Sequence, residues 1–323
     1  MFSRLTLTII LVAIISTTLL ISCSKGPANI QNVGMILETE IKDHPWNEKG
    51  YIGLERIKRA YQVNVYVKEN IQTSLEVERA VDDLTSSGVN LIFGHGPTYG
   101  KYFSQLSRHY PDTHFVYFNG NFSDVNVTSL NIDPHAIGFF SGMIAGEMTA
   151  SNEIGMIGAY EWQPELEGFF EGVKYANEDA NVHMDFVNNN DEANIALSMY
   201  ENMAKKDIDV IFPIGDSFSE TVIRQATNDG LYAMGYMEDQ SYINEHLVLT
   251  STIHHVEDLY EYAARSFERG KLQGGIYTFD FAEEAVSFGQ FSDDIPEDVI
   301  SNVEQAVEMY IELNTLPNER EAY

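Results

Sequence analysis

Short apolar runs recur along the chain between polar or glycine-bearing turns, and they alternate with longer amphipathic stretches. A run of four or five apolar residues is too short for a helix and indicates a strand buried on both faces. We expect such strands at 33–37, 63–67, 89–93, 115–118, 127–131, 154–158, 182–187, 208–212, 232–236, 248–253, 276–281 and 285–288. Because amphipathic stretches separate most of them, the pattern predicts an α/β protein with parallel sheets.

The second half of the chain repeats the first. The stretch 89–99, which contains Gly94 and His95, returns 119 residues later as 208–218, which contains Gly215 and Asp216. Three more pairs of segments keep a similar spacing; they begin near residues 33 and 154, 50 and 168, and 115 and 233. A repeat in constant order predicts two similar doubly wound parallel-sheet lobes. Ligands of such sheets bind beyond the carboxyl ends of the strands, so we expect a cleft between the lobes.

The expected boundaries follow from this order. Lobe 1 would comprise 33–130 plus 250–280, lobe 2 would comprise 131–249 plus 281–315, and 316–323 would form a tail. Crossover strands join the lobes, and the strand 248–253 is expected to return to lobe 1.

The N-terminus has the pattern of a targeting segment. Arg4 precedes an apolar stretch, Leu5 to Ile21, which ends just before Cys23, the single cysteine of the chain. An apolar run, a small residue and a lone cysteine resemble a bacterial lipobox, in which a diacylglycerol is attached to the thiol. We therefore expect a signal peptide at 1–22, lipidation of Cys23, a tether at 23–32 and anchoring on the extracytoplasmic face of the cell membrane. The alternative is an ordinary signal peptide or an uncleaved anchor.

The charge of the chain and its lack of catalytic motifs argue against several classes of function. Lys and Arg number 19 against 49 Asp and Glu, a formal net charge of -30, whereas a nucleic-acid-binding surface has to be basic. We expect no nucleic-acid partner. The chain shows no Gly-x-Ser-x-Gly, phosphate-loop or His-Glu-x-x-His motif, so we expect neither an enzyme nor a cofactor. Adjacent side chains such as His254 and His255 point different ways, which argues against a metal site.

Several segments together resemble the basic-membrane-protein family, lipoproteins of the type I periplasmic-binding-protein fold that supply nucleosides to ABC transporters. The segments that carry the resemblance over residues 33–315 are Pro45-Trp46-Asn47, Gly88 to Gly94, Tyr110 to Phe115, Asn126 to Ser129, Gly138 to Gly142, Asp209 to Pro213 and Glu238 to Ser241. Within the family the chain is most similar to the Med-type lipoproteins, which are linked to control of competence gene expression; Gln163-Pro164-Glu165, Asp239-Gln240-Ser241 and 248–252 fit that subgroup.

The resemblance implies a ligand site, only partly retained here. Trp46 stands where the family stacks a Phe on the base, and Asn47 stands at the family's Asn, with capping of its own helix as the alternative. Asn119 takes the place of a usual Asp, Met237 that of the ribose-binding Asp and His254 that of a ribose-contacting Lys. The second stacking Phe falls on Glu165, with Trp162 as the alternative partner.

Four more candidates come from the turns after strands. His95, Gly215 and Asp216 are expected to line the cleft, and Asp239 is expected to tie the hinge structurally. For His95 the alternative is a loop histidine, and for Asp216 it is an N-cap of the following helix.

Two functions remain. The first is the substrate-binding component of an ABC transporter, with a nucleoside or related heterocycle as ligand and a permease as partner. The second is a Med-type regulatory lipoprotein, which acts positively on competence gene expression through a membrane partner, without transport and without direct DNA binding.

Overall fold

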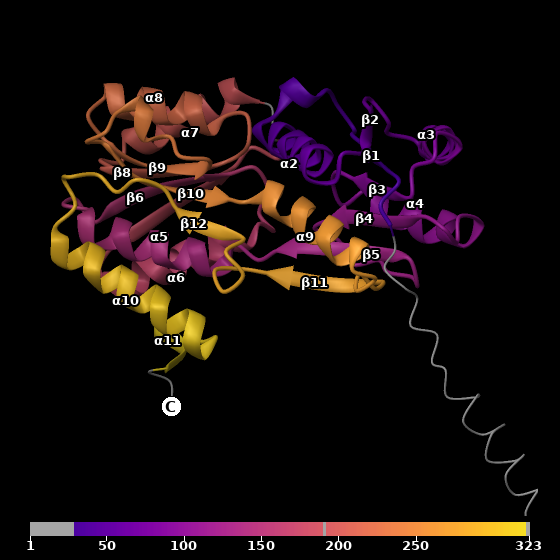
Figure 1. The fold of residues 1–323 in the computed structure, drawn as a ribbon. Helices are drawn as coiled ribbons and strands as arrows, with labels where there is room; N and C mark the ends of the chain where they lie inside the picture. The colour runs from indigo at the N-terminus through magenta and orange to yellow at the C-terminus, as the bar shows by residue number, and fades with distance from the viewer. Residues whose placement is uncertain (1–28, 190–191, 321–323) are drawn as a thin grey trace, which may run out of the picture.

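The computed structural model describes residues 29–189 and 192–320 and shows two lobes side by side (Figure 1). Each lobe holds one six-stranded sheet with helices on both faces, so the predicted α/β two-lobe fold is confirmed. The signal peptide, Cys23 and most of the tether lie outside the described residues. In the described part of the chain, no helix is long and apolar enough to cross a membrane.

The sheet of lobe 1 has the strand order β11-β5-β4-β3-β1-β2, and all of its pairs are parallel. Its strands are β1 (Asn32–Ile36), β2 (Asn64–Lys68), β3 (Leu91–Gly94), β4 (His114–Phe118), β5 (Val127–Ile132) and β11 (Gly275–Phe279). The helices of this lobe are α2 (Pro45–Tyr61), α3 (Ser74–Ser86), α4 (Tyr99–Leu106) and α9 (Val256–Glu268), with short 3₁₀ turns η1 (Ile41–Asp43) and η2 (Ser107–His109).

The sheet of lobe 2 has the order β12-β10-β9-β8-β6-β7. Its strands are β6 (Glu153–Gly158), β7 (Asn181–Phe186), β8 (Val210–Ile214), β9 (Tyr232–Met237), β10 (Val248–His254) and β12 (Val286–Phe288). Its helices are α5 (His135–Met148), α6 (Pro164–Ala176), α7 (Ala193–Ala204), α8 (Ser219–Asn228), α10 (Glu297–Leu313) and α11 (Pro317–Arg320), with η3 (Ser241–Ile243). One pair departs from the parallel prediction: β12 runs antiparallel to β10.

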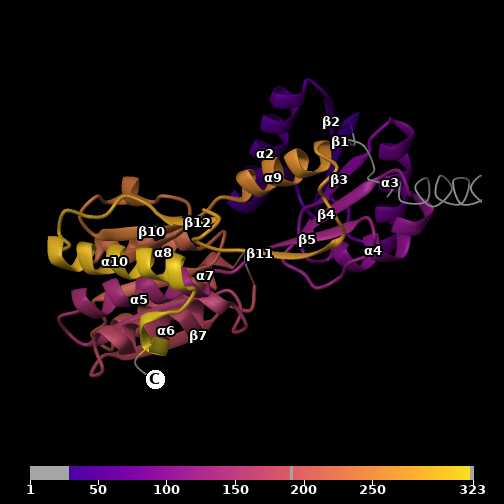
Figure 2. The same cartoon turned by 60° about the horizontal axis from the view of Figure 1, so that its bottom comes forward.

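The prediction that strand 248–253 returns to lobe 1 is wrong. This strand, β10, pairs with β9 and β12 in the sheet of lobe 2. The chain crosses to lobe 1 only after His254, where α9 begins and packs against α2 (Figure 2). A doubly buried strand has the same apolar sequence in either sheet, so its pattern did not reveal its neighbours.

Close packing of α5 on α6 explains why α5 is lined by small and apolar residues. A Cβ added to Gly142 would lie 2.1 Å from the carbonyl oxygen of Phe169, and one added to Gly172 would lie 1.8 Å from that of Phe139. The glycines allow the two backbones to touch, and an alanine at either position would force the helices apart. The two helices therefore form one rigid layer of lobe 2.

The repeat is visible in backbone geometry as well as in sequence. Asn119 follows β4 with a φ of 56°, and Met237, 118 residues later, ends β9 with a φ of 72°. Both are in the left-handed region, which asparagine tolerates and a long apolar side chain rarely adopts. The strain at Met237 lies at the edge of lobe 2 that faces lobe 1, where functional sites commonly store it.

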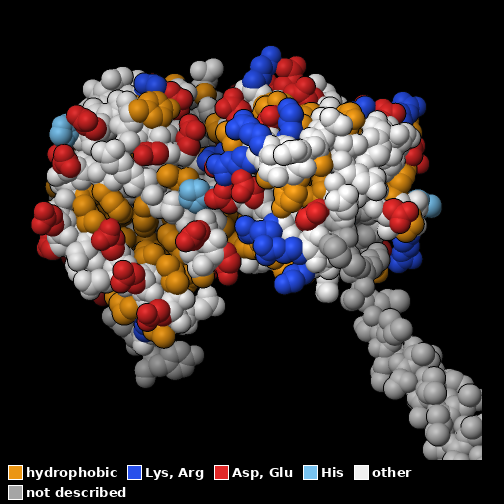
Figure 3. Space-filling model, viewed as in Figure 1, with side chains coloured by type: hydrophobic (Ala, Val, Ile, Leu, Met, Phe, Trp, Pro, Cys, Tyr) orange, Lys and Arg blue, Asp and Glu red, His pale blue; other side chains and the backbone are white. Residues whose placement is uncertain are grey.

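Charge is divided unevenly between the lobes. On the face shown in Figure 3, Asp and Glu dominate lobe 2, whereas Lys and Arg gather on lobe 1 around α2 and α9. Arg56 of α2 pairs with Glu257, Asp258 and Glu261 of α9. These exposed pairs contribute little energy individually, but they join α2 to α9 along their length.

Candidate ligand site between the lobes

The N-terminus of α2 brings the first aromatic candidate to the interlobe junction. The helix begins at Pro45, directly after His44, and Trp46 follows in its first turn. Asn47 does not cap the helix, contrary to one expectation. Its side-chain amide donates instead to Thr39 Oγ1 and to the carbonyl of Glu40, both at 2.9 Å, and Asn47 is 6% exposed. Asn47 therefore fixes the loop before α2.

His95 holds Trp46 in place through a hydrogen bond and a ring stack. Its Nε2 lies 2.9 Å from the carbonyl oxygen of Trp46 and its Nδ1 lies 2.9 Å from the hydroxyl of Tyr260. A carbonyl can only accept, so Nε2 carries the proton and Nδ1 accepts from Tyr260. The imidazole also stacks on the Trp46 indole, with ring centroids 4.9 Å apart. Burial lowers the pKa of His95 to about 3, so the ring is neutral at physiological pH.

The corresponding helix start in lobe 2 carries an acid instead of a ring. Helix α6 begins at Pro164, and its second residue, Glu165, stands 119 positions after Trp46. Glu165 is 4% exposed and accepts from the hydroxyl of Tyr236 at 3.1 Å and from the amide of Gln163 at 3.3 Å. Burial raises the pKa of Glu165, and burial together with that carboxyl raises the pKa of Tyr236 well above its usual value. The two walls therefore differ in chemistry.

Polar side chains join the two lobes directly. His44, from lobe 1, lies with its Nδ1 2.9 Å from Ser217 Oγ and 3.9 Å from Asp216 Oδ2, both in the turn between β8 and α8 of lobe 2. Asp216 does not cap α8, because that helix begins at Ser219. The residue before Asp216 has to be a glycine, since a Cβ added to Gly215 would lie 2.1 Å from the Phe218 ring.

The strand ends hold the remaining predicted residues. Asn119 is exposed after β4, and its Oδ1 accepts from the backbone of Ile132 at 3.1 Å. Met237 is buried at the end of β9. His254 ends β10, is 5% exposed and packs edge-on against Tyr236 at 5.6 Å. Burial, and then the nearby Lys49 ammonium, lower the pKa of His254 to about 3.

Two predicted residues lie away from this cluster. Trp162 is 72% exposed and stacks on Tyr160, with centroids 5.1 Å apart, in the turn before α6. Asp239 accepts from the backbone of Ser241 and of Gln290, and both partners belong to lobe 2. Asp239 therefore joins two segments of one lobe, and neither bond crosses the junction.

Sequence reasoning missed His44, Ser217, Tyr236 and Lys49. The repeat contained a signal for His44, because it precedes Pro45 as Gln163 precedes Pro164. Tyr236 was assigned only to a buried strand, and nothing in its local pattern showed that its hydroxyl meets Glu165. Within the described residues, no cluster of three or more His, Cys, Asp or Glu side chains has an arrangement that would hold a metal ion.

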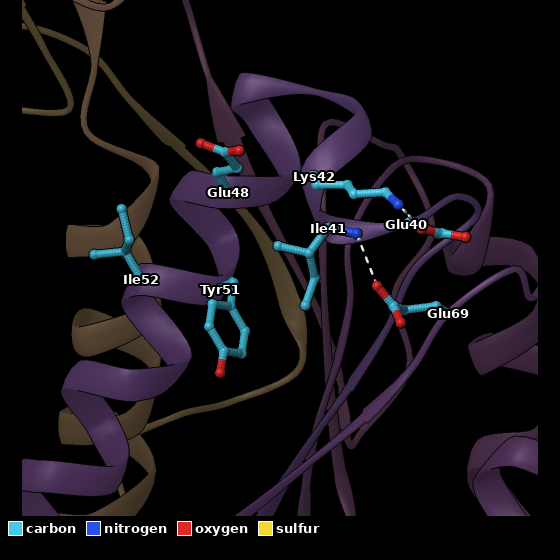
Figure 4. A pocket seen from close by; sticks show the side chains of 7 residues that line it. All are labelled: Glu40, Ile41, Lys42, Glu48, Tyr51, Ile52 and Glu69. Atoms are coloured by element: carbon cyan, nitrogen blue, oxygen red, sulfur yellow. Dashed lines mark hydrogen bonds and ion pairs between the residues drawn. The ribbon is translucent and has the colours of Figure 1, made fainter.

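Two surface hollows lie outside this junction. One, of about 470 Å³, is lined by Ile41, Tyr51 and Ile52 together with Lys42 and the glutamates Glu40, Glu48 and Glu69 (Figure 4). Its Lys42 pairs with Glu40 at 2.9 Å, and Glu69 accepts from the backbone of Ile41. The second, of about 570 Å³, lies between α5, α6, α10 and α11. Neither contains any of the nine predicted ligand residues.

Comparison with known sequences places this geometry in context. Residues 30–317 match the Bmp family, described as ABC transporter substrate-binding protein PnrA-like. The chain is 38% identical over 310 residues to the transcriptional activator protein Med of Bacillus subtilis, covering 95% of this chain and 98% of that protein. It is 23% identical over 273 residues to basic membrane protein D of Borreliella burgdorferi, covering 80% of each chain.

Solved structures show the same relationships. A transcriptional activator of the comK gene from Bacillus halodurans superposes with a TM-score of 0.83 at 37% identity, covering 88% of this chain and 99% of that one. An ABC transporter solute-binding protein from Conexibacter woesei superposes with a TM-score of 0.73 at 16% identity, covering 89% and 99%. The latter likeness shows the fold alone.

Proposed function

The chain belongs to the Bmp family of PnrA-like ABC transporter substrate-binding proteins, and on this premise we propose that it binds a small molecule between its lobes and regulates transcription in response. It acts from the extracytoplasmic face of the membrane, anchored through Cys23. The signal passes to a membrane partner, because a net charge of -30 disfavours direct binding to the phosphates of DNA.

The unequal walls of the junction carry this proposal. Trp46 supplies an aromatic ring at the start of α2 in lobe 1, whereas the equivalent position of lobe 2, Glu165, is a buried carboxyl bonded to Tyr236. The direct contact of His44 with Ser217 supports a junction that closes around a ligand, since closure is driven by contacts that a ligand makes with both lobes. Such a ligand stacks on one side and forms hydrogen bonds on the other, unlike a base held between two rings.

The regulatory output rests on full-length similarity to proteins named as transcriptional activators. Identities of 38% and 37% extend over almost the whole of both relatives. Changed side chains at Asn119, Met237 and His254 agree with a family fold that has been kept while its transport ligand has changed.

Transport is the second candidate, and the family match favours it. In that case the chain delivers a nucleoside or related heterocycle to an ABC permease. Uptake of a labelled nucleoside by cells with and without the gene separates the two functions, because only a transport component changes the uptake rate.

The regulatory proposal is tested in the host cell. Deletion of the gene should lower expression from a comK-type promoter reporter, and the intact chain should restore it. Chains with Trp46→Ala or Cys23→Ser, present at normal level, should not restore it. Unchanged reporter activity in the deletion strain would refute the regulatory role.

A thermal-shift screen with nucleosides tests the identity of the ligand, since a bound ligand raises the melting temperature of the protein. A flat response to every purine and pyrimidine nucleoside would exclude the nucleoside.

A further inference from the structure

The larger surface hollow runs along one helix of lobe 2. It lies between α5, α6, α10 and α11, and the residues of α10 that line it extend from Val299 to Met309. At a rise of 1.5 Å per residue this stretch is about 15 Å long, or almost three turns of helix. Met143 of α5 and Tyr175 of α6 line the opposite wall. We call this hollow, between 299–309 and these two side chains, the α10 groove.

Apolar side chains at the α10 groove are open to solvent. Met309 is 44% exposed and Tyr175 is 37% exposed. Leu313, which is also exposed, follows Met309 by one turn on the same side of α10. Figure 3 shows hydrophobic side chains gathered over the part of lobe 2 where Figure 1 places α10. An exposed apolar patch beside polar residues is typical of a surface that binds a partner.

The shape of the α10 groove fits a helix. Helices form its walls, and a further helix packs on such a surface by placing its ridges of side chains into the grooves between theirs. An amphipathic helix that binds in this way inserts side chains at positions i, i+3 or i+4, and i+7. These positions span about 10 Å, so they fit within the length of the groove.

The charge around the α10 groove favours a basic partner. Helix α10 has no Lys or Arg, and its acidic residues are Glu297, Asp298, Glu304, Glu308 and Glu312. Glu147 of α5 lines the groove and forms no ion pair with another described residue. Arg320 of α11 also lines it, but its guanidinium donates to the carbonyl of Thr315 at 2.6 and 3.1 Å. Such a surface attracts a basic partner and repels a second copy of this acidic chain.

We propose that the α10 groove binds a basic amphipathic helix of the membrane protein that receives the signal. This inference rests on the proposed function, because it names the surface through which the signal leaves the chain. The apolar face of the partner helix covers Met309, Tyr175 and Leu313, and its Lys and Arg side chains lie beside Glu147 and the acidic residues of α10. The groove is separate from the interlobe junction, so both can be occupied together.

The first test uses a designed peptide as the probe. It is a fluorescent helix of about 18 residues, made of Leu and Lys with the Leu residues on one face, and a shuffled peptide of the same composition has no such face. Anisotropy measures binding to the full-length protein in phosphatidylcholine discs, with empty discs as the blank. The amphipathic peptide should bind about 10-fold more tightly than the shuffled one, and added salt should weaken its binding. Equal binding of the two peptides would overturn the proposal.

Met309→Glu separates binding in the groove from general attraction between opposite charges. The variant adds a negative charge, so general attraction would tighten binding of the peptide. Loss of the apolar contact should instead weaken binding by about 10-fold. Ile311→Glu is the matched control, because Ile311 is 45% exposed on the same helix but does not line the groove. Tighter binding by Met309→Glu, or an equal loss in the control, would overturn the proposal.

A second pair of variants tests the acidic side of the α10 groove. Glu147→Lys reverses a charge that lines the groove and should lower the affinity for the amphipathic peptide by about 3- to 10-fold at low salt. Glu78→Lys, at an exposed position of α3 in lobe 1, makes the same change in net charge and should have a smaller effect. Equal effects would overturn the proposal. So would light scattering that shows a dimer which Met309→Glu converts to a monomer, because a second copy would then occupy the groove.

The reporter assay separates this inference from the proposed function. In the deletion strain, the chain with Ile311→Glu should restore the comK-type reporter, and the chain with Met309→Glu, present at the same level, should not. If both chains restore it, the α10 groove does not transmit the signal, and this inference fails while the regulatory function stands. If deletion itself leaves the reporter unchanged, the regulatory function fails, and the membrane partner assigned to the groove fails with it.

Discussion

Replacing Tyr260 by Phe removes a single hydroxyl that holds the lobe-1 wall of the junction. Tyr260 is fully buried, and its hydroxyl donates to His95 Nδ1 at 2.9 Å. The Phe ring keeps the stacking on Phe93 and Phe118, so no cavity forms. What remains is a buried imidazole nitrogen without a donor, which costs about 1–3 kcal/mol of the free energy of unfolding.

The assay follows unfolding in urea at pH 7.5 through tryptophan fluorescence. In a Trp162→Phe background, emission reports only Trp46, which lies on His95. Tyr51→Phe serves as the control, because the Tyr51 hydroxyl lies 3.5 Å from Glu55 Oε1 on the surface of α2, and its loss should cost less than about 0.5 kcal/mol. A loss for Tyr260→Phe no larger than that of the control would refute the assigned bond.

A double-mutant cycle with His95→Leu checks the same bond independently. Once the imidazole is gone, the hydroxyl has lost its acceptor, so the double variant should be less destabilised than the sum of the single variants. Strict additivity would show that Tyr260 and His95 do not interact. It would also contradict the conclusion that this pair holds Trp46 in place.

Three further predictions concern the other walls. Glu165→Gln keeps the oxygen that accepts from Tyr236 but removes a carboxyl whose pKa burial raises. The parent loses stability as the pH rises from the ordinary pKa of a glutamate through the raised one, because the unfolded state gives up its proton first. The variant should therefore be more stable than the parent at pH 7.5 and equal to it near pH 4 in thermal denaturation. Equal stability at pH 7.5 would contradict this. His95 and His254 have a pKa of about 3, below the 6.5 of an unfolded histidine, so the unfolded state binds more protons between these values and stability should fall on acidification, by roughly 2 kcal/mol per histidine at pH 5. His254→Phe should remove about half of that fall, and an unchanged pH dependence in calorimetry would contradict the pKa assignment. Asn119→Ala should cost about 2 kcal/mol through its positive φ and the lost bond to Ile132, whereas Asn119→Gly should cost about 1 kcal/mol; equal losses in urea would show that the backbone is unstrained.

The sequence alone was sufficient for the strands, the repeat and the family. Each buried strand is marked by its own apolar run and closing turn, which are local properties. The spacing between copies then predicted two lobes.

Only the tertiary structure decided which distant segments pair and which side chains form hydrogen bonds with each other. The strand β10 was assigned to the wrong lobe because burial on both faces looks alike in either sheet. The role of Asn47 depends on its hydrogen bond to Glu40, seven residues earlier. The two hydrogen bonds of the neutral His95 ring include one from Tyr260, 165 residues later.

The chemistry of the junction shows the same division. Local pattern determined which side chains stand at strand and helix ends, because periodicity and turn residues act over a few positions. It did not determine that His44 meets Ser217, that Glu165 is buried against Tyr236, or that His254 Nε2 is buried without a hydrogen-bond partner among the described residues. Those facts depend on how two lobes, joined by crossovers far apart in sequence, pack against each other, and desolvation and hydrogen bonding at that junction are set by this packing.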